Sequence, residues 1–188
     1  MMRIKILALL AFAVIISGCG PSKDLTIDQR RDEINEMRVK SLQQFYQEID
    51  EGKNIIDKAE GYGVFSNVNV NVIFVSGGGG YGMVVNNNTG EKTYMKMGEA
   101  GIGLGIGVKD FRAIVVFHSK ETMNKFITSG WEFGANADAS AKSGEKGGAA
   151  EASGTLASGM SLYEFTESGI TLQATLSGTK YWKDKELN

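Results

Sequence analysis

The stretch Ala100-Gly101-Ile102-Gly103-Leu104-Gly105-Ile106-Gly107-Val108 alternates glycine with aliphatic residues at a period of two. Successive side chains of a strand point to opposite faces, so this pattern predicts a strand with one aliphatic face and one face of bare backbone. In a helix the glycines would be scattered around the axis, each costing ~1 kcal/mol relative to alanine. We therefore predict that Gly101, Gly103, Gly105 and Gly107 are structural glycines, which let another segment pack closely on the bare face.

The composition is that of a glycine-rich folded chain. Its 188 residues include 25 glycines and one proline, and the glycines fall inside apolar runs, which favours tightly packed or bent strands over a disordered linker. The formal charge of −2 excludes a strongly basic nucleic-acid binder. Any attraction to anionic lipid must therefore come from a local patch.

Residues 1–18 have the features of a lipoprotein signal peptide. Arg3 and Lys5 precede an apolar run over residues 6–16 that is too short to span a bilayer. The following Ile16-Ser17-Gly18-Cys19 resembles a bacterial lipobox, an aliphatic residue and two small residues before the cysteine that receives lipid. The alternative is an ordinary signal peptide with a chance cysteine.

The lipobox resemblance implies cleavage before Cys19, diacylglycerol on its sulfur and an acyl chain such as palmitate on the new amino group. Two or more chains anchor a protein stably, whereas one chain binds only marginally. By the sorting rule of bacterial lipoproteins, Gly20 implies the outer membrane in a host that has one. Cys19 is the only cysteine, so an intramolecular disulfide is excluded.

A polar tether is predicted over residues 19–25 and a helical region over residues 26–60. Thr26 and Gln29 have the spacing of a capping box. An apolar stripe on a helix ending at Gly52 then comprises Ile34, Met37, Leu42, Phe45 and Ile49, with Ser41 filling one step. We expect this stripe to pack on a sheet, because the opposite face is too acidic for a typical membrane-surface helix. A second short helix is predicted near residues 54–59.

Strand patterns begin at residue 61, and a sheet is predicted over residues 61–178. Within it, Gly77–Gly80 is predicted as a flexible bend and Lys109–Asp110 as a turn, while Arg112–His118 is predicted as a strand covered on both faces. Ser119 is a candidate cap for a short helix over residues 120–128. A second strand of small residues is predicted over residues 135–141, followed by a mobile tip over 143–148.

A closing meander is predicted over residues 149–156, 160–165 and 169–176, and a charged tail over residues 179–188, anchored by Tyr181 and Trp182. The predicted fold class is α+β. Amphipathic helices at the amino terminus are followed by a curled, barrel-like antiparallel sheet of glycine-rich strands with one short inserted helix. Residues 26–188 form one domain in this interpretation.

The order of these features resembles the SYLF domain, which bacterial lipoproteins share with eukaryotic actin-regulating proteins. The resemblance implies a lipid-binding domain, whereas actin binding does not carry over to an exported bacterial protein. Ser66 stands where the family usually has proline, and Asn69–Asn71 replaces a more glycine-rich stretch, which affects lipid preference more than fold. The matching segments are 59–65, 79–82, 101–108, 110–111, a helix ending at Phe126, 134–139 and 169–172.

No catalytic constellation emerges from the sequence. Gly77–Gly82 fits G-x-G-x-x-G, but a strand continues after it where a dinucleotide site needs a helix. His118 is the only histidine, which excludes a histidine metal cluster. Glu132 and Asp138 are six residues apart and are interpreted as surface carboxylates, although Asp138 lies among alanines. Ser161 and Ser177 have no recognisable nucleophile context.

We therefore predict a membrane-anchored lipid-binding lipoprotein of the cell envelope, without catalytic activity, cofactor, metal or nucleic-acid partner. Lys142 and Lys146 are candidate contacts for lipid headgroups, and Lys180, Lys183 and Lys185 form a second lysine cluster. The alternative is a structural or scaffolding envelope lipoprotein that binds a protein partner. A hydrolase is the third interpretation, and it would need a nucleophile and base that converge in the fold.

Overall fold

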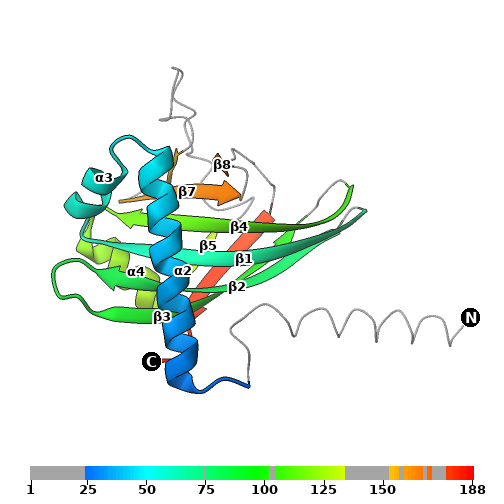
Figure 1. The fold of residues 1–188 in the computed structure, drawn as a ribbon, viewed down its shortest axis with the longest axis horizontal. Coiled ribbons are helices and arrows are strands. Elements are labelled where there is room, and N and C mark those ends of the chain that lie inside the picture. Colours follow the sequence, from blue (N-terminus) through cyan, green and yellow to red (C-terminus); the bar gives the residue numbers. More distant parts are fainter. Residues whose placement is uncertain are drawn as a thin grey trace, which may run out of the picture.

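The computed structural model describes residues 24–73, 75–101, 105–133, 153–156, 159–166, 169–170 and 177–188. Within these residues, helices α2 (Ile27–Glu48), α3 (Gly52–Lys58) and α4 (Lys120–Ser129) accompany one antiparallel sheet (Figure 1). The predicted α+β class with a curled sheet is confirmed. The strands are β1 (Gly61–Ile73), β2 (Val75–Asn86), β3 (Lys92–Gly101), β4 (Gly105–Phe117), β5 (Trp131–Phe133), β6 (Ser153–Leu156), β7 (Met160–Thr166), β8 (Gly169–Ile170) and β9 (Ser177–Lys183).

Several predictions fall on residues outside the described part of the chain. These are the signal and lipobox with Ile16, Ser17, Gly18 and Cys19, the structural glycine Gly103, the strand over residues 135–141, the tip over 143–148, and the lysines Lys142 and Lys146.

Helix α2 forms as its sequence predicts. Thr26 and Gln29 make a complete capping box, in which the Gln29 amide donates to Thr26 Oγ1 at 3.3 Å and the Thr26 amide donates to Gln29 Oε1 at 2.9 Å. The buried residues of the helix are those of the predicted stripe, Ser41 included. The helix ends at Glu48, because the next residue is extended, and Gly52 begins α3 instead of ending α2.

The described strands form a sheet in the order β5-β9-β3-β2-β1-β4-β7-β6, with β8 paired to β7. The first three strands form a meander, and β4 then returns to lie beside β1, which is a Greek-key arrangement. Residues 179–183, predicted as part of the charged tail, are in strand β9. The sheet therefore extends beyond the predicted limit at residue 178.

The prediction of one strand over residues 100–108 is wrong. Gly101 ends β3 beside Ser76 of β2, and Gly105 begins β4 beside Ile73 of β1, so the two ends of the stretch belong to different strands on opposite sides of the β1–β2 hairpin. Of the predicted structural glycines, Gly101 lies at this end of β3, while Gly105 and Gly107 lie in β4.

Two other predicted breaks are also wrong, because pairing with neighbouring strands overrides local turn preferences. Lys109–Asp110 lies inside β4, paired with Asn69 and Val68 of β1. Gly77–Gly80 lies inside β2, paired on both sides with β1 and β3.

The close approach expected at bare backbone occurs in β2. A β-carbon added to Gly82 would collide with the carbonyl of Val64 and the ring of Phe65, and one added to Gly80 would collide with the carbonyl of Ser66. Since both collisions involve β1, glycine at these positions permits the tight contact between the two strands.

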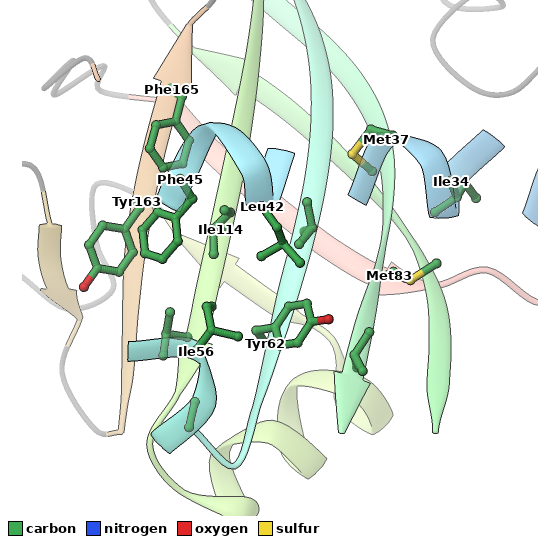
Figure 2. Close-up of a cluster of buried hydrophobic side chains, with 14 of the residues drawn as sticks. Ile34, Met37, Leu42, Phe45, Ile56, Tyr62, Met83, Ile114, Tyr163 and Phe165 are labelled. Atoms are coloured by element: carbon green, nitrogen blue, oxygen red, sulfur yellow. The ribbon is translucent and has the colours of Figure 1, made fainter. Parts of the chain in front are cut away.

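The two faces of the sheet carry separate apolar cores. Helices α2 and α3 cover the outer face, where Phe45 packs against Tyr163 and Phe165 with ring centroids 4.9 and 5.8 Å away (Figure 2). Helix α4 covers the inner face, where Phe126 packs against Phe117 and Tyr181 with ring centroids 5.1 and 5.2 Å away. Figure 1 shows α2 lying across the strands, with α4 and the red strand β9 behind them.

Candidate functional site

The second lysine cluster of the sequence gathers with an exposed tryptophan around β9. We define the lysine–tryptophan surface as Lys96, Lys180, Trp182, Lys183 and Lys185. Trp182 is 40% exposed, an unusual state for so large an apolar side chain in this protein. Lys180, Lys183 and Lys185 are also exposed. Of the two residues expected to anchor this segment, Tyr181 is buried and Trp182 is not.

Strand alternation explains part of this arrangement, but Lys183 pairs with Met95 of the inner core and so lies on the opposite face of β9 from Trp182. Tyr181 faces the inner core, with its ring centroid 4.7 Å from that of Phe65, so its neighbours Lys180 and Trp182 face outward. Trp182 pairs with Lys96 of β3, and its ring lies over Gly98, where an added β-carbon would be only 3.2 Å from the ring. Burial raises the pKa of the Tyr181 hydroxyl, which keeps it neutral at physiological pH.

Two carboxylates partly neutralise the lysine–tryptophan surface. Asp184 Oδ1 lies 3.3 Å from Lys96 Nζ, and Glu132 Oε2 lies 3.8 Å from Lys180 Nζ. Glu132, predicted as a surface carboxylate, is therefore exposed and paired with a lysine, whereas Asp138 lies outside the described residues. The exposed ion pair with Lys180 contributes little stability and leaves that ammonium accessible.

The end of the chain holds this surface rigidly. Arg31 donates from Nη2 to the Leu187 carbonyl at 2.9 Å, and Arg30 Nη1 lies 3.0 Å from Glu186 Oε2. Leu187 is buried in the outer core. The segment after β9 is thus fixed to α2, so the surface sits on ordered backbone.

The structure brings His118 and Ser161 together, which the sequence did not indicate. His118 directly follows β4, and its Nε2 lies 2.8 Å from Ser161 Oγ on β7. His118 therefore has a hydrogen-bond partner that is distant in sequence. Ser161 is buried. Ser177 begins β9, paired with Gly101.

A buried polar group on the inner face was missed by the sequence analysis. Asn67 of β1 donates from Nδ2 to Glu99 Oε2 of β3 at 2.8 Å, and both residues are buried. Burial, with the charge of Glu99 nearby, raises the pKa of the Glu164 carboxyl of β7 to about 7. The sequence contains a signal for this. At a spacing of two residues, Glu99 falls on the same strand face as Met95 and Met97, and Glu164 falls on the same face as Met160 and Leu162.

The helices of the described residues include none that combines the length and apolar character needed to cross a bilayer. Among the same residues, no three His, Cys, Asp or Glu side chains come together as a metal-binding group.

Comparison with known proteins supports the family resemblance. Residues 98–188 match the Ysc84 (SYLF) family, described as "Las17-binding protein actin regulator". The resemblance predicted from the sequence is confirmed over that segment, which contains all of the lysine–tryptophan surface except Lys96.

One curated relative extends the similarity over most of the chain. Beta cell expansion factor A of Aeromonas veronii is 36% identical over 162 residues, which make up 86% of this chain and 60% of the relative. The chain therefore spans about three fifths of the length of that relative.

Proposed function

We propose that this protein is a membrane-anchored lipoprotein whose SYLF-like domain binds lipid without catalysing a reaction. The observation that carries the lipid-binding part is the lysine–tryptophan surface. Lysine ammonium groups attract anionic headgroups, while a half-exposed indole suits the boundary between water and acyl chains. The match to the Ysc84 family over residues 98–188 supports this assignment at the level of the family, whose members include lipid-binding and actin-regulating proteins.

Vesicle co-flotation with the Cys19→Ala chain tests domain binding apart from the anchor. We expect binding to vesicles containing anionic lipid and weaker binding to zwitterionic vesicles. The triple variant Lys180→Gln/Lys183→Gln/Lys185→Gln should lose about tenfold or more in affinity, because each lysine near an anionic surface contributes about 1 kcal/mol. Trp182→Ala should weaken binding to both vesicle types.

The matched control is Lys40→Gln/Tyr46→Ala on the solvent face of α2, which also removes an exposed lysine and an exposed aromatic ring. This control should bind like the parent chain. Lys142→Gln/Lys146→Gln tests the headgroup contacts predicted from the sequence. Lack of association with vesicles of any composition would refute lipid binding by the domain.

The anchor belongs to the same proposal, with Ile16, Ser17 and Gly18 as the lipobox and Cys19 as the attachment site. Mass spectrometry of the amino-terminal peptide should find a lipidated Cys19, and Cys19→Ala should release the protein from membranes. The proposed location is the periplasmic side of the outer membrane in a host that has one. An unprocessed amino terminus in the membrane-bound protein would contradict the anchor.

The second candidate function is binding of a protein partner, which the solvent face of α2 favours. Val39 and Tyr46 lie seven positions apart on this helix and are 43% and 37% exposed, and Val39 borders a shallow groove with Arg38 and Lys92. A stoichiometric partner lost in Val39→Ser/Tyr46→Ser, without any change in vesicle binding, would favour this function.

A further inference from the structure

We propose that the inner face of the sheet holds a hard divalent cation, of the Ca²⁺ or Mg²⁺ type, between Asn67, Glu99 and Glu164. The three residues come from β1, β3 and β7, and strand alternation with Phe65, Met97 and Leu162 of the inner core places all three on the inner face. This site is separate from the lysine–tryptophan surface and does not depend on lipid binding.

The side chain of Asn67 has a buried oxygen without a hydrogen-bond partner. Its side chain is 1% exposed, its Nδ2 donates to Glu99 Oε2 at 2.8 Å, and its Oδ1 has no hydrogen-bond partner. Since Oδ1 and Nδ2 belong to one amide group, this buried oxygen lies close to the Glu99 carboxylate. A buried acceptor without a donor is costly in an apolar interior, and a cation bound to Oδ1 removes that cost.

The carboxylates add negative charge that the described residues do not balance. Glu99 is 8% exposed, and its only hydrogen bond to the described residues comes from Asn67. Glu164 has no hydrogen bond or ion pair within the same part of the chain, and its charge interacts unfavourably with that of Glu99. Buried charges are normally paired or bound to metal, so a divalent cation accounts for the buried Glu99 carboxylate, and the partly buried Glu164 supplies a second carboxylate on the same face.

The ligand chemistry selects the class of cation. All three groups bind through oxygen, two as carboxylates and one as an amide carbonyl, without thiolate or imidazole. Oxygen-only sets suit Ca²⁺ and Mg²⁺ rather than Zn²⁺ or Cu²⁺. Water molecules complete the coordination of either ion, because three side chains provide fewer than six ligands.

The glycines of β2 explain how residues of β1 and β3 meet. In the sheet register Asn67 pairs with Gly80 and Glu99 pairs with Gly78, so bare backbone separates the two side chains. A β-carbon on Gly80 would lie 2.8 Å from Met97 Cγ and 3.0 Å from Asn67 Cα. Glycine at this position therefore lets the amide of Asn67 reach over β2 to Glu99.

The test uses the full chain in neutral detergent, first stripped with EDTA and then titrated with CaCl₂, MgCl₂ or TbCl₃. We expect Ca²⁺ or Mg²⁺ to raise the melting temperature by several degrees through linkage. Tb³⁺ should show luminescence sensitised by aromatic residues of the inner core, which Ca²⁺ reverses by competition. Glu99→Gln and Glu164→Gln should each weaken cation binding by about tenfold or more. Mutating a residue that only hydrogen-bonds to a metal ligand already lowers metal affinity by about that factor, and losing a ligand should lower it at least as much.

Glu33→Gln, on the exposed face of α2, is the matched control and should bind the cation like the parent chain. If a variant fails to fold, the Tb³⁺ and Ca²⁺ competition in the parent chain still decides the proposal. A parent chain without any cation-dependent change, or Glu99→Gln and Glu164→Gln variants that keep it, would overturn the site.

Discussion

The outer face of the sheet is covered mainly by α2, a single continuous helix, whereas α4, β5 and β9 close the inner face from separate parts of the sequence. The helix side of the outer core comes from a short window of sequence, while the inner core joins Phe65, Phe126 and Tyr181 across more than a hundred residues. A pattern within one window suffices to predict the first arrangement. The second depends on how the sheet curls.

The inner face also differs in polarity. Beyond its aromatic cluster the inner face buries Asn67 and the carboxylate of Glu99. Strand alternation with Val64 and Tyr163 places the buried Ser66 and Ser161 on the outer face, where Ser41 of α2 is also buried. The inner face is therefore where both the largest packing effects and a polar site are expected.

Phe126→Ala should destabilise the protein by about 4 kcal/mol, because it empties the centre of the inner aromatic cluster. Phe126 is fully buried and contacts Phe65, Phe117, Trp131 and Tyr181. Chemical denaturation measures the effect. Tyr46→Ala, which removes an exposed ring, should change stability by less than about 0.5 kcal/mol. Equal losses in the two variants would contradict the assignment of the inner core.

Gly82→Ala should cost about 3 kcal/mol, because the new methyl group would strike the Val64 carbonyl and the Phe65 ring and push β1 and β2 apart. Gly77→Ala is the control on the same strand, since its β-carbon would come no closer than 3.9 Å to the Glu99 carbonyl. Urea unfolding of both variants gives the comparison. If Gly77→Ala were the more damaging of the two, the curl of the sheet would not depend on the close approach at Gly82.

Glu164→Gln should change how stability depends on pH, measured with EDTA present. The pKa of Glu164 is raised to about 7, so the folded state holds a proton that the unfolded state has released. The stability of the parent protein therefore falls as pH rises from the ordinary carboxyl range to about 7 and is level above it. The variant lacks this loss, so its advantage over the parent should grow by about 2 kcal/mol between about pH 5 and about pH 8.

The control for this pH profile is Glu33→Gln, whose carboxylate is exposed. Its stability should follow that of the parent protein at every pH. Parallel profiles for the parent and Glu164→Gln would show that Glu164 titrates in the folded protein as it does in water.

Thr26→Ala should cost about 1 kcal/mol, because it removes the oxygen that accepts the Gln29 amide at the start of α2. The loss should appear first as faster hydrogen exchange in the first turn of α2, with α4 and β9 unchanged. Thr128→Ala, whose hydroxyl donates to a carbonyl within α4, should have a smaller effect. Spread of the faster exchange into the inner core would mean that the two faces are strongly coupled.

The sequence predicted best where one segment contains all the information. The capping box at Thr26 and Gln29, the buried stripe from Ile34 to Phe45 and the cap of α4 at Ser119 are confirmed. Predictions of bends and turns failed where strand pairing decided the outcome. Gly77–Gly80 and Lys109–Asp110 have turn-forming residues, but hydrogen bonds to neighbouring strands keep both segments extended.

The candidate sites were predicted less completely. The sequence showed the cluster of Lys180, Lys183 and Lys185, but it did not show that Trp182 beside them is exposed. Which side chains of β9 face the core is known only once the pairing of β9 in the sheet is known. Glu99 and Glu164 are 65 positions apart, and no local pattern shows that they share the inner face.

By itself the sequence determined the α+β class, the amphipathic helix and its cap, since periodicity and capping act between residues a few positions apart. The tertiary structure alone decided which strands are neighbours and which side chains meet on the inner face. This is because the curl of the sheet depends on the pairing of many strands that are far apart in the sequence. Asn67 reaches Glu99 only because β2 lies between their strands with glycine at the crossing.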